Sequence, residues 1–211
     1  MRPPAFLPNW PSRVAWLALI VYSFYAASIL EITWERFVIG LDNGMRFIGR
    51  MLPPDTTSSK LQLLAQGLYE SIEIAIIASA LGILLSLPMG LLAARNLMPA
   101  WITWPMRLFI ALCRSFHQVI IAIVFVKAVG FGALAGILAL TVASIGFTAK
   151  LFAEAIEEIS LKQVEAIRAT GAPFSSVIAY GVLPQVLTRF VGFATYQVDS
   201  NLRNSTMVGI V

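Results

Sequence analysis

The sequence has few charged residues and almost none of the side chains that catalytic and metal sites most often require. Charged residues make up 12% of its 211 residues, against roughly 25% in an average soluble domain. The chain has one cysteine, Cys113, and one histidine, His117. These counts exclude an intrachain disulfide and a multi-cysteine metal site, and they leave little for a zinc or catalytic cluster. We therefore expect no catalytic residue and no metal site in this chain.

What the sequence has in excess is apolar side chains, which form 58% of the chain and give a mean hydropathy of +0.81. A soluble domain of this length needs a polar shell that such a composition cannot supply. This argues against a cytosolic enzyme and a disordered chain. The net charge of +4 is spread between apolar runs and forms no basic patch, so we expect no nucleic-acid partner. The composition predicts an all-α, polytopic membrane protein in contact with lipid.

Five apolar runs are close to the roughly 20 residues that a helix needs to cross a bilayer. They are Val14–Leu30, Ile74–Ala94, 108–126, 134–149 and Val177–Val198. We expect the first run to be an uncleaved anchor rather than a signal peptide. In the second run, Pro88 is a candidate kink, and Gly82 and Gly90 allow close helix contact.

Positive charge predicts the orientation of these runs, because cytoplasmic loops are enriched in lysine and arginine. The basic residues lie before the first run, between the second and third, and after the fourth. They are Arg2, Arg13, Arg95, Arg107, Lys150, Lys162 and Arg168. The N-terminus is then expected on the cytoplasmic side of the membrane.

The segment 31–70 is mixed in character, and two interpretations stay open. Apolar residues between Phe37 and Met51 recur at near-helical spacing, which indicates an amphipathic helix on a membrane face. A solvated loop fits the composition equally well. We therefore divide the chain into an anchor with this interfacial segment, 1–70, and a core domain, 71–211.

A polar stretch follows the fourth run and predicts a helix, a sharp turn and a second helix. Ser160 and Gln163 have capping-box spacing, which favours a helix over about Leu161–Thr170. Gly171 suits the left-handed conformation that ends a helix, and Pro173 suits the first turn of the next. On a polytopic protein, such an element is either a connector or a docking site for a partner.

Other polar residues lie within or beside the apolar runs. Arg114, His117 and Gln118 fall inside the third run, with the first two on much the same helical face. Either a substrate path or a structural role fits them. Ser144 and Thr148 share a face, and hydrogen bonding back to their own helix is the default expectation.

The last run carries polar residues that also call for an interpretation. Asp199 and Arg203 have the spacing of a local ion pair. A water-facing surface is expected for Tyr196, Gln197, Asn201, Asn204 and Ser205.

One motif in the polar stretch resembles the EAA loop of ABC-importer permeases. That pattern reads Glu-Ala-Ala, three residues, Gly, nine residues, Ile, one residue, Leu-Pro. Glu165, Ala166, Gly171, Leu183 and Pro184 match it. Two positions depart: Ile167 replaces the second alanine, and Gly181 replaces the isoleucine.

Further segments resemble permeases of phosphonate and phosphite ABC importers. They are LLAARN at 91–96, CRSFHQVIIAIVFVKAVGFG at 113–132, SIGFTAKLFAEAIEEI at 144–159 and the stretch 182–211. The resemblance implies a type I importer permease of the MetI-like fold, with a cytoplasmic coupling loop at about 155–176. It implies that the permease is a homodimer in the inner membrane of a bacterium. The homodimer would sit on two ATPase subunits, which bind ATP and magnesium, and would receive substrate from a periplasmic binding protein. This chain itself is then no enzyme and holds no cofactor.

The resemblance also implies roles for single residues and leaves alternatives open. The five matched motif residues would couple the chain to the ATPase. Substrate-path candidates are Arg114, His117, Gln118, Ser144, Thr148 and Arg203, for a small oxyanion such as phosphonate or phosphite. A permease for an amino acid is the alternative, and a channel, a secondary transporter or a membrane enzyme fits less well. Family members continue into a further span, so we expect one core helix to be missing from this sequence.

Overall fold

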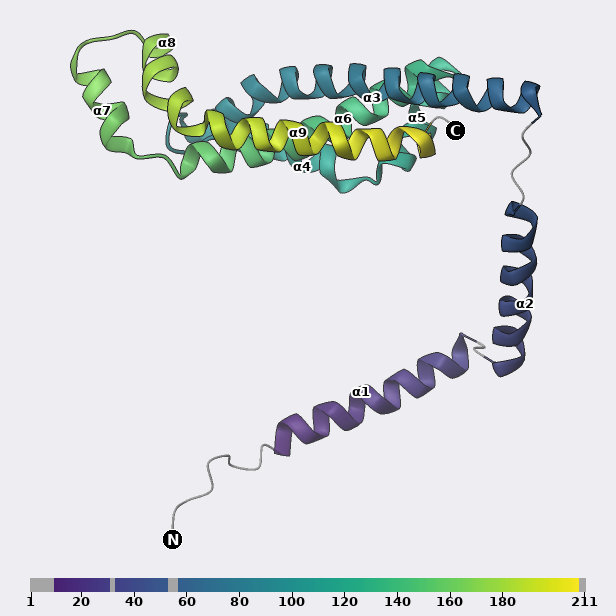
Figure 1. Ribbon diagram of the computed structural model, residues 1–211. Helices are drawn as coiled ribbons and strands as arrows, with labels where there is room; N and C mark the ends of the chain where they lie inside the picture. The colour runs from purple at the N-terminus through teal and green to yellow at the C-terminus, as the bar shows by residue number, and fades with distance from the viewer. Residues whose placement is uncertain (1–9, 31–32, 53–56, 209–211) are drawn as a thin grey trace. The chain divides into compact units, whose positions relative to one another are not determined.

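The computed structural model describes residues 10–30, 33–52 and 57–208, and the regular structure in these ranges is helical (Figure 1). The chain divides into two compact units, Met1–Thr57 and Ser58–Val211. Each unit is considered by itself.

The first unit contains α1 (Trp10–Ile29) and α2 (Trp34–Met51). Helix α1 has no buried residue and is apolar enough to cross a membrane. Helix α2 begins at Thr33, whose hydroxyl oxygen accepts a hydrogen bond from the backbone N–H of Arg36 (3.4 Å). Over its 18 residues the expected amphipathic helix is confirmed and the loop interpretation is wrong, while its place on a membrane face stays a prediction.

Three long helices form the centre of the second unit: α3 (Ser58–Ala93), α6 (Ala133–Glu157) and α9 (Leu183–Val208). Helices α3 and α6 approach closely because two glycines of α3 face α6. A Cβ atom on Gly82 would lie 2.4 Å from Cβ of Ser144, and one on Gly90 would lie 2.7 Å from Cδ1 of Phe152. The expected close contact at both glycines is therefore confirmed. Helix α3 continues through Pro88.

The expected third span is two helices rather than one. α4 (Ala100–Ser115) and α5 (Gln118–Val129) meet at an angle of 93° across Phe116 and His117. The single straight helix over 108–126 is therefore wrong. Arg114 and His117 do not share a helical face, because one lies in the last turn of α4 and the other precedes α5.

The polar stretch folds as helix, turn and helix, as predicted. It comprises α7 (Leu161–Ala169), α8 (Phe174–Ser176) and a π-helical segment, η1 (Val177–Val182), which leads into α9. Gly171 adopts a φ of +75°, the left-handed conformation expected of it. The capping box is wrong, because the Ser160 side chain makes no capping hydrogen bond. Pro173 precedes α8 instead of lying in its first turn.

Lengths and apolarity make this a multi-pass membrane protein. Within the described ranges, α1, α3, α6 and the segment Phe174–Met207 are each long and apolar enough to cross a bilayer. The bent pair α4 and α5 supplies a fifth crossing if it is one span. The positions agree with the five predicted runs, although α3 and α6 extend well beyond them.

Candidate functional site

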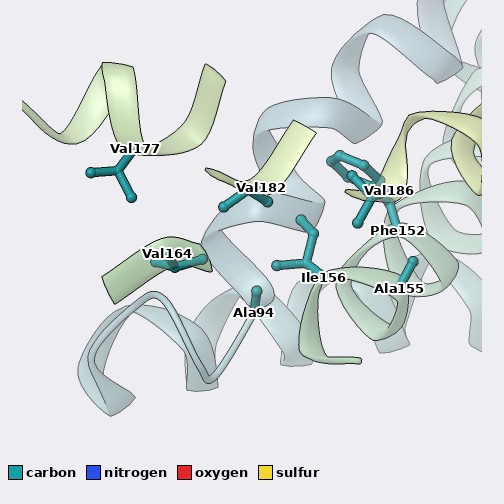
Figure 2. Packing of buried hydrophobic residues seen from close by; sticks show 8 residues of the cluster. All are labelled: Ala94, Phe152, Ala155, Ile156, Val164, Val177, Val182 and Val186. Carbon is teal, nitrogen blue, oxygen red and sulfur yellow. The ribbon is translucent and has the colours of Figure 1, made fainter. Parts of the chain in front are cut away.

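The predicted coupling loop, which contains α7 and the turn after it, lies at one end of the second unit (Figure 1) and packs on an apolar cluster. Val164 of α7 is 1% exposed, and Figure 2 shows it beside Ile156 of α6 and Val177 and Val182 of η1. The same cluster continues to Phe152 of α6 and to further residues of α3 and α9. Its remaining buried members are Ala94, Ala155 and Val186. Helix α7 is therefore packed, through its inner face, into one apolar cluster with residues of α3, α6, η1 and α9.

The two departures from the EAA pattern lie against each other. A Cβ atom on Gly181 would lie 3.2 Å from Cδ1 of Ile167 and 3.5 Å from Cα of Val164. The larger side chain at one position thus occupies the space left by the smaller residue at the other. The contact between α7 and η1 is therefore kept, with the large residue on α7 and the small residue on η1.

The residues that match the EAA pattern lie on the exposed side of this packed element. Glu165 and Ala166 are exposed on α7, and Gly171 is exposed in the turn that follows. Leu183 and Pro184 are exposed at the start of α9. Helix α7 and the start of α9 lie at one end of the second unit (Figure 1), and Val164 packs α7 onto the apolar cluster. Glu165 is thus an exposed carboxylate on a helix whose opposite face is buried, which leaves it available for contact with another protein.

Polar contacts that the sequence analysis missed tie the end of α6 to its neighbours. Glu157 accepts hydrogen bonds from the guanidinium of Arg107 on α4 (2.5 Å) and from the backbone N–H of Arg95 (2.7 Å). Glu158, the next residue, forms an ion pair with Arg189 of α9. These acidic and basic residues are far apart in sequence, so spacing alone gave no signal for the pairs.

Gln185 of α9 holds the start of the coupling helix. Its Oε1 accepts the backbone N–H of Ser160 (2.9 Å), and its Nε2 donates to the carbonyl of Gly181 (2.6 Å). The side chain therefore bridges the residue before α7 and the π-helical segment. Its position one residue after the Leu-Pro pair is the only sequence feature that marks it.

A second group of polar residues is buried between the three long helices. Nδ2 of Asn201 donates to Oγ of Ser79 (2.9 Å) and of Ser144 (2.8 Å), and Nε2 of Gln197 donates to the same Ser144 oxygen (2.9 Å). Oδ1 of Asn201 accepts from Gln197 (2.9 Å). This polar cluster joins α3, α6 and α9. Polar residues four apart on α9, opposite serines in apolar runs, are the signal that would have predicted it.

These contacts correct two expectations. Gln197, Asn201 and Ser205 are 0–3% exposed, so the water-facing surface predicted for the end of the chain is wrong for them. The default of bonding back to the helix is wrong for Thr148, whose buried Oγ1 has no partner in the described ranges. It is wrong for Ser144 too, whose hydroxyl oxygen accepts two hydrogen bonds from α9 and makes no bond to its own helix among the described residues. Both side chains are wholly buried within the unit.

Three of the substrate-path candidates share one cavity of about 440 Å³ at the bend between α4 and α5. Arg114, His117 and Gln118 line it together with Asn204 of α9. Arg203 is not among its lining residues; it forms the expected ion pair with Asp199 at 2.8 Å. Of the six candidates, the structure thus brings Arg114, His117 and Gln118 together. It buries Ser144 and Thr148, and it leaves Arg203 exposed on α9.

Comparison with known proteins gives a family and several relatives. Residues 86–211 match the family described as binding-protein-dependent transport system inner membrane component. The chain is 42% identical over 163 residues to the phosphate-import permease protein PhnE of Mycolicibacterium smegmatis, covering 77% of this chain and 30% of that protein. It is 38% identical over 173 residues to the phosphite transport system permease protein PtxC of Stutzerimonas stutzeri, covering 82% and 62%. The chain thus spans less than two thirds of either relative.

Solved structures share the fold. A chain of the MetNI methionine ABC transporter in its inward-facing conformations superposes with a TM-score of 0.65 at 24% identity, covering 71% of this chain and 74% of that one. A chain of an amino acid ABC transporter crystallised with histidines gives 0.59 at 19% identity, covering 72% and 73%. The predicted all-helical fold of the MetI-like type is therefore confirmed.

Proposed function

The chain belongs to the family of binding-protein-dependent transport system inner membrane components, and from this we propose that it is the permease subunit of an ATP-driven importer for a small phosphorus oxyanion. Phosphonate and phosphite are the substrates we favour. The observation that carries the substrate class is the identity of 42% and 38% to permeases named for phosphate and phosphite. The likeness to amino-acid transporters lies below 25% identity and concerns the fold alone.

The coupling loop supports the ATP-driven part of this proposal. We propose that Glu165 and the small residues beside it dock on a cytoplasmic ATPase, which binds ATP and magnesium. Val164 and Ile167 carry the resulting motion into the helices beneath. The paired contacts of Glu157 and Glu158 then distribute it to α4 and α9.

We further propose that two copies of the permease assemble with two ATPase subunits and receive substrate from a periplasmic binding protein. Closed two-fold assembly supplies one coupling loop for each ATPase. Purification of the complex followed by native mass spectrometry measures this stoichiometry directly. A complex with a single permease copy would contradict the proposal.

Uptake of radiolabelled phosphite and methylphosphonate by cells that express the whole importer tests the function. Glu165→Ala is expected to reduce uptake about tenfold, because a charge-assisted contact to the ATPase is lost. Glu73→Ala removes an exposed carboxylate of α3 outside the coupling loop and is the matched control. Unchanged uptake in Glu165→Ala would contradict the coupling role. Amino-acid uptake without uptake of phosphite, methylphosphonate or phosphate would contradict the substrate class.

A further inference from the structure

The cavity at the bend between α4 and α5 lies near the middle of the membrane-crossing helices. Ala143 of α6 lines it, ten residues after the start of that helix and fourteen before its end. At 1.5 Å per residue, these segments span about 15 Å and 21 Å. A hydrocarbon core is about 30 Å thick. The cavity is therefore at mid-depth, where ionisable groups are costly and mark functional paths.

Arg114 is the main feature of this cavity. Its stem rests on α6, because a Cβ atom on Gly146 would lie 2.8 Å from Cγ of Arg114. Its guanidinium makes no ion pair or hydrogen bond within residues 10–30, 33–52 and 57–208, and the residue is exposed on the surface of the chain. A bare guanidinium at this depth is not stable against lipid, so this face turns toward a polar path.

Arg114 also borders a second cavity of about 340 Å³. In the proposed orientation, this cavity lies on the cytoplasmic side of Arg114. Two other basic residues line that cavity, and each is neutralised. Arg107 pairs with Glu157 (2.5 Å) and Lys150 pairs with Glu154 (3.5 Å). Among these three cations, Arg114 alone keeps its charge available for a ligand.

Uncharged donors surround Arg114 in the bend cavity. Nδ1 of His117 accepts the backbone N–H of Val119 (3.4 Å), which leaves Nε2–H as the free donor of the ring. The amides of Gln118 and Asn204 also line the space, and no lining residue is acidic. The cavity of about 440 Å³ is ample for a small molecule.

We propose that this cavity is a transient binding site for a tetrahedral phosphorus oxyanion. The Arg114 guanidinium would bind two of its oxygens, and His117, Gln118 and Asn204 would donate to the others. The inference rests on the proposed function and deepens it, because it assigns the substrate a site within the membrane.

The polar cluster supports this site from behind. Ser144 follows Ala143 on α6, and Asn201 lies one turn before Asn204 on α9, so the hydrogen bonds between them fix the two helices that close the cavity. These residues act by positioning and would not touch the anion.

Thiol labelling measures the charge preference of the cavity without relying on transport. In the assembled complex, with Cys113→Ala removing the native thiol, Ala143→Cys places the single cysteine of this chain in the wall of the bend cavity and outside the second cavity. We expect an anionic methanethiosulfonate to react about tenfold faster, relative to a cationic one, than it does with a free thiol. Millimolar phosphite or methylphosphonate is expected to slow this labelling.

Two variants decide whether Arg114 is the cause. Arg114→Gln should remove both the charge preference and the protection, and should lower phosphite uptake at least tenfold. Arg114→Lys should keep the preference but restore uptake only in part, since the planar fork is lost. Lys127→Gln, at the far end of α5 and outside the cavity, is the matched control and should change neither.

The outcomes separate this site from the proposed function. Equal labelling by both reagents, or full uptake in Arg114→Gln, would overturn the anion site while phosphite import still stood. Anion preference and protection that depend on Arg114, in an importer that takes up no phosphorus oxyanion, would uphold the site and overturn the substrate class.

Discussion

Ile167 and Gly181 show how the inner contact of α7 tolerates change. The Ile167 side chain lies against the backbone of Gly181 where the family pattern has alanine opposite isoleucine, so the combined side-chain volume differs from the pattern only by a methyl group. Core contacts tolerate exchanges that conserve volume far better than single changes in size. The contact therefore depends on the pair, and neither residue can be judged alone.

A double exchange tests this pairing. Gly181→Ile alone should crowd Ile167, weaken the docking of α7 and cost about 1–3 kcal/mol of stability. Ile167→Ala alone should leave a cavity and cost about 2–5 kcal/mol. The double variant restores the family pattern and should recover most of both losses. Thermal unfolding in detergent and phosphite uptake give the two readouts, and additive losses in the double variant would refute the compensation.

The turn after α7 depends on a single backbone conformation. Gly171 has a φ of +75° with open space around it, so strain rather than a clash limits substitution. Gly171→Val should cost about 1–2 kcal/mol and distort the turn, lowering uptake. Gly171→Asn should be close to wild type, because asparagine adopts this conformation readily. Equal uptake in both variants would show that the turn is not under this constraint.

At the scale of elements, the contact between α3 and α6 sets the frame on which the cavity and the coupling loop are built. Without a hydrophobic force between helices in lipid, close backbone approach and interhelical hydrogen bonds supply the association. Gly82 provides the close approach at the level of Ser144, and the polar cluster provides the hydrogen bonds. Ser144 therefore takes part both in the close helix contact and in the hydrogen bonds.

Two glycine-to-alanine substitutions in α3 distinguish the loss of this helix contact from the effect of alanine on helix propensity. Gly82→Ala places Cβ 2.4 Å from Cβ of Ser144, and neither atom can move without shifting its helix. We expect a loss of about 1–3 kcal/mol, or failure to assemble. Gly67→Ala, also in α3, meets nothing within 4 Å and should be neutral or slightly stabilising. Chemical or thermal unfolding of the purified protein compares them, and equal effects would remove Gly82 from the contact.

Much of the element order could be read from apolar runs and caps, but the bend between α4 and α5 could not. No glycine or proline lies between Cys113 and Ile120, and the break falls at Phe116, which is extended with φ −106° and ψ 140°. The packing of Arg114 on Gly146 is a long-range contact, and local propensity does not report it. The three cavity residues were therefore named, but their arrangement was not.

Which residues of α9 are buried was predicted wrongly for a related reason. In a soluble helix, polar residues mark the water side, but in lipid both the exposed and the buried faces are apolar. Polar residues then mark buried hydrogen bonds as readily as water. Gln197 and Asn201 were assigned to water and are buried against two serines. The ion pair of Asp199 and Arg203 was predicted correctly because it needs only local spacing.

At the scale of the whole molecule, five crossings, taking the bent α4 and α5 as one, fix which loops share a side of the membrane. With that number of crossings, we expect the coupling loop on the same side of the membrane as the residues before α1. We expect helix α2 on the other side, because one crossing, α1, would separate it from the N-terminus. The basic residues favour the cytoplasm for the first group.

Accessibility of single cysteines to an impermeant maleimide in intact cells tests this topology. In a Cys113→Ala background, Ser12→Cys in the first turn of α1 and Ser175→Cys in the coupling loop should label only after the membrane is permeabilised. Asn43→Cys, on the exposed polar side of α2, should label in intact cells at once. Rapid labelling of Ser175→Cys in intact cells would place the coupling loop outside, where no ATPase can reach it. Protection of Asn43→Cys together with Ser12→Cys would instead mean that α1 does not cross the membrane.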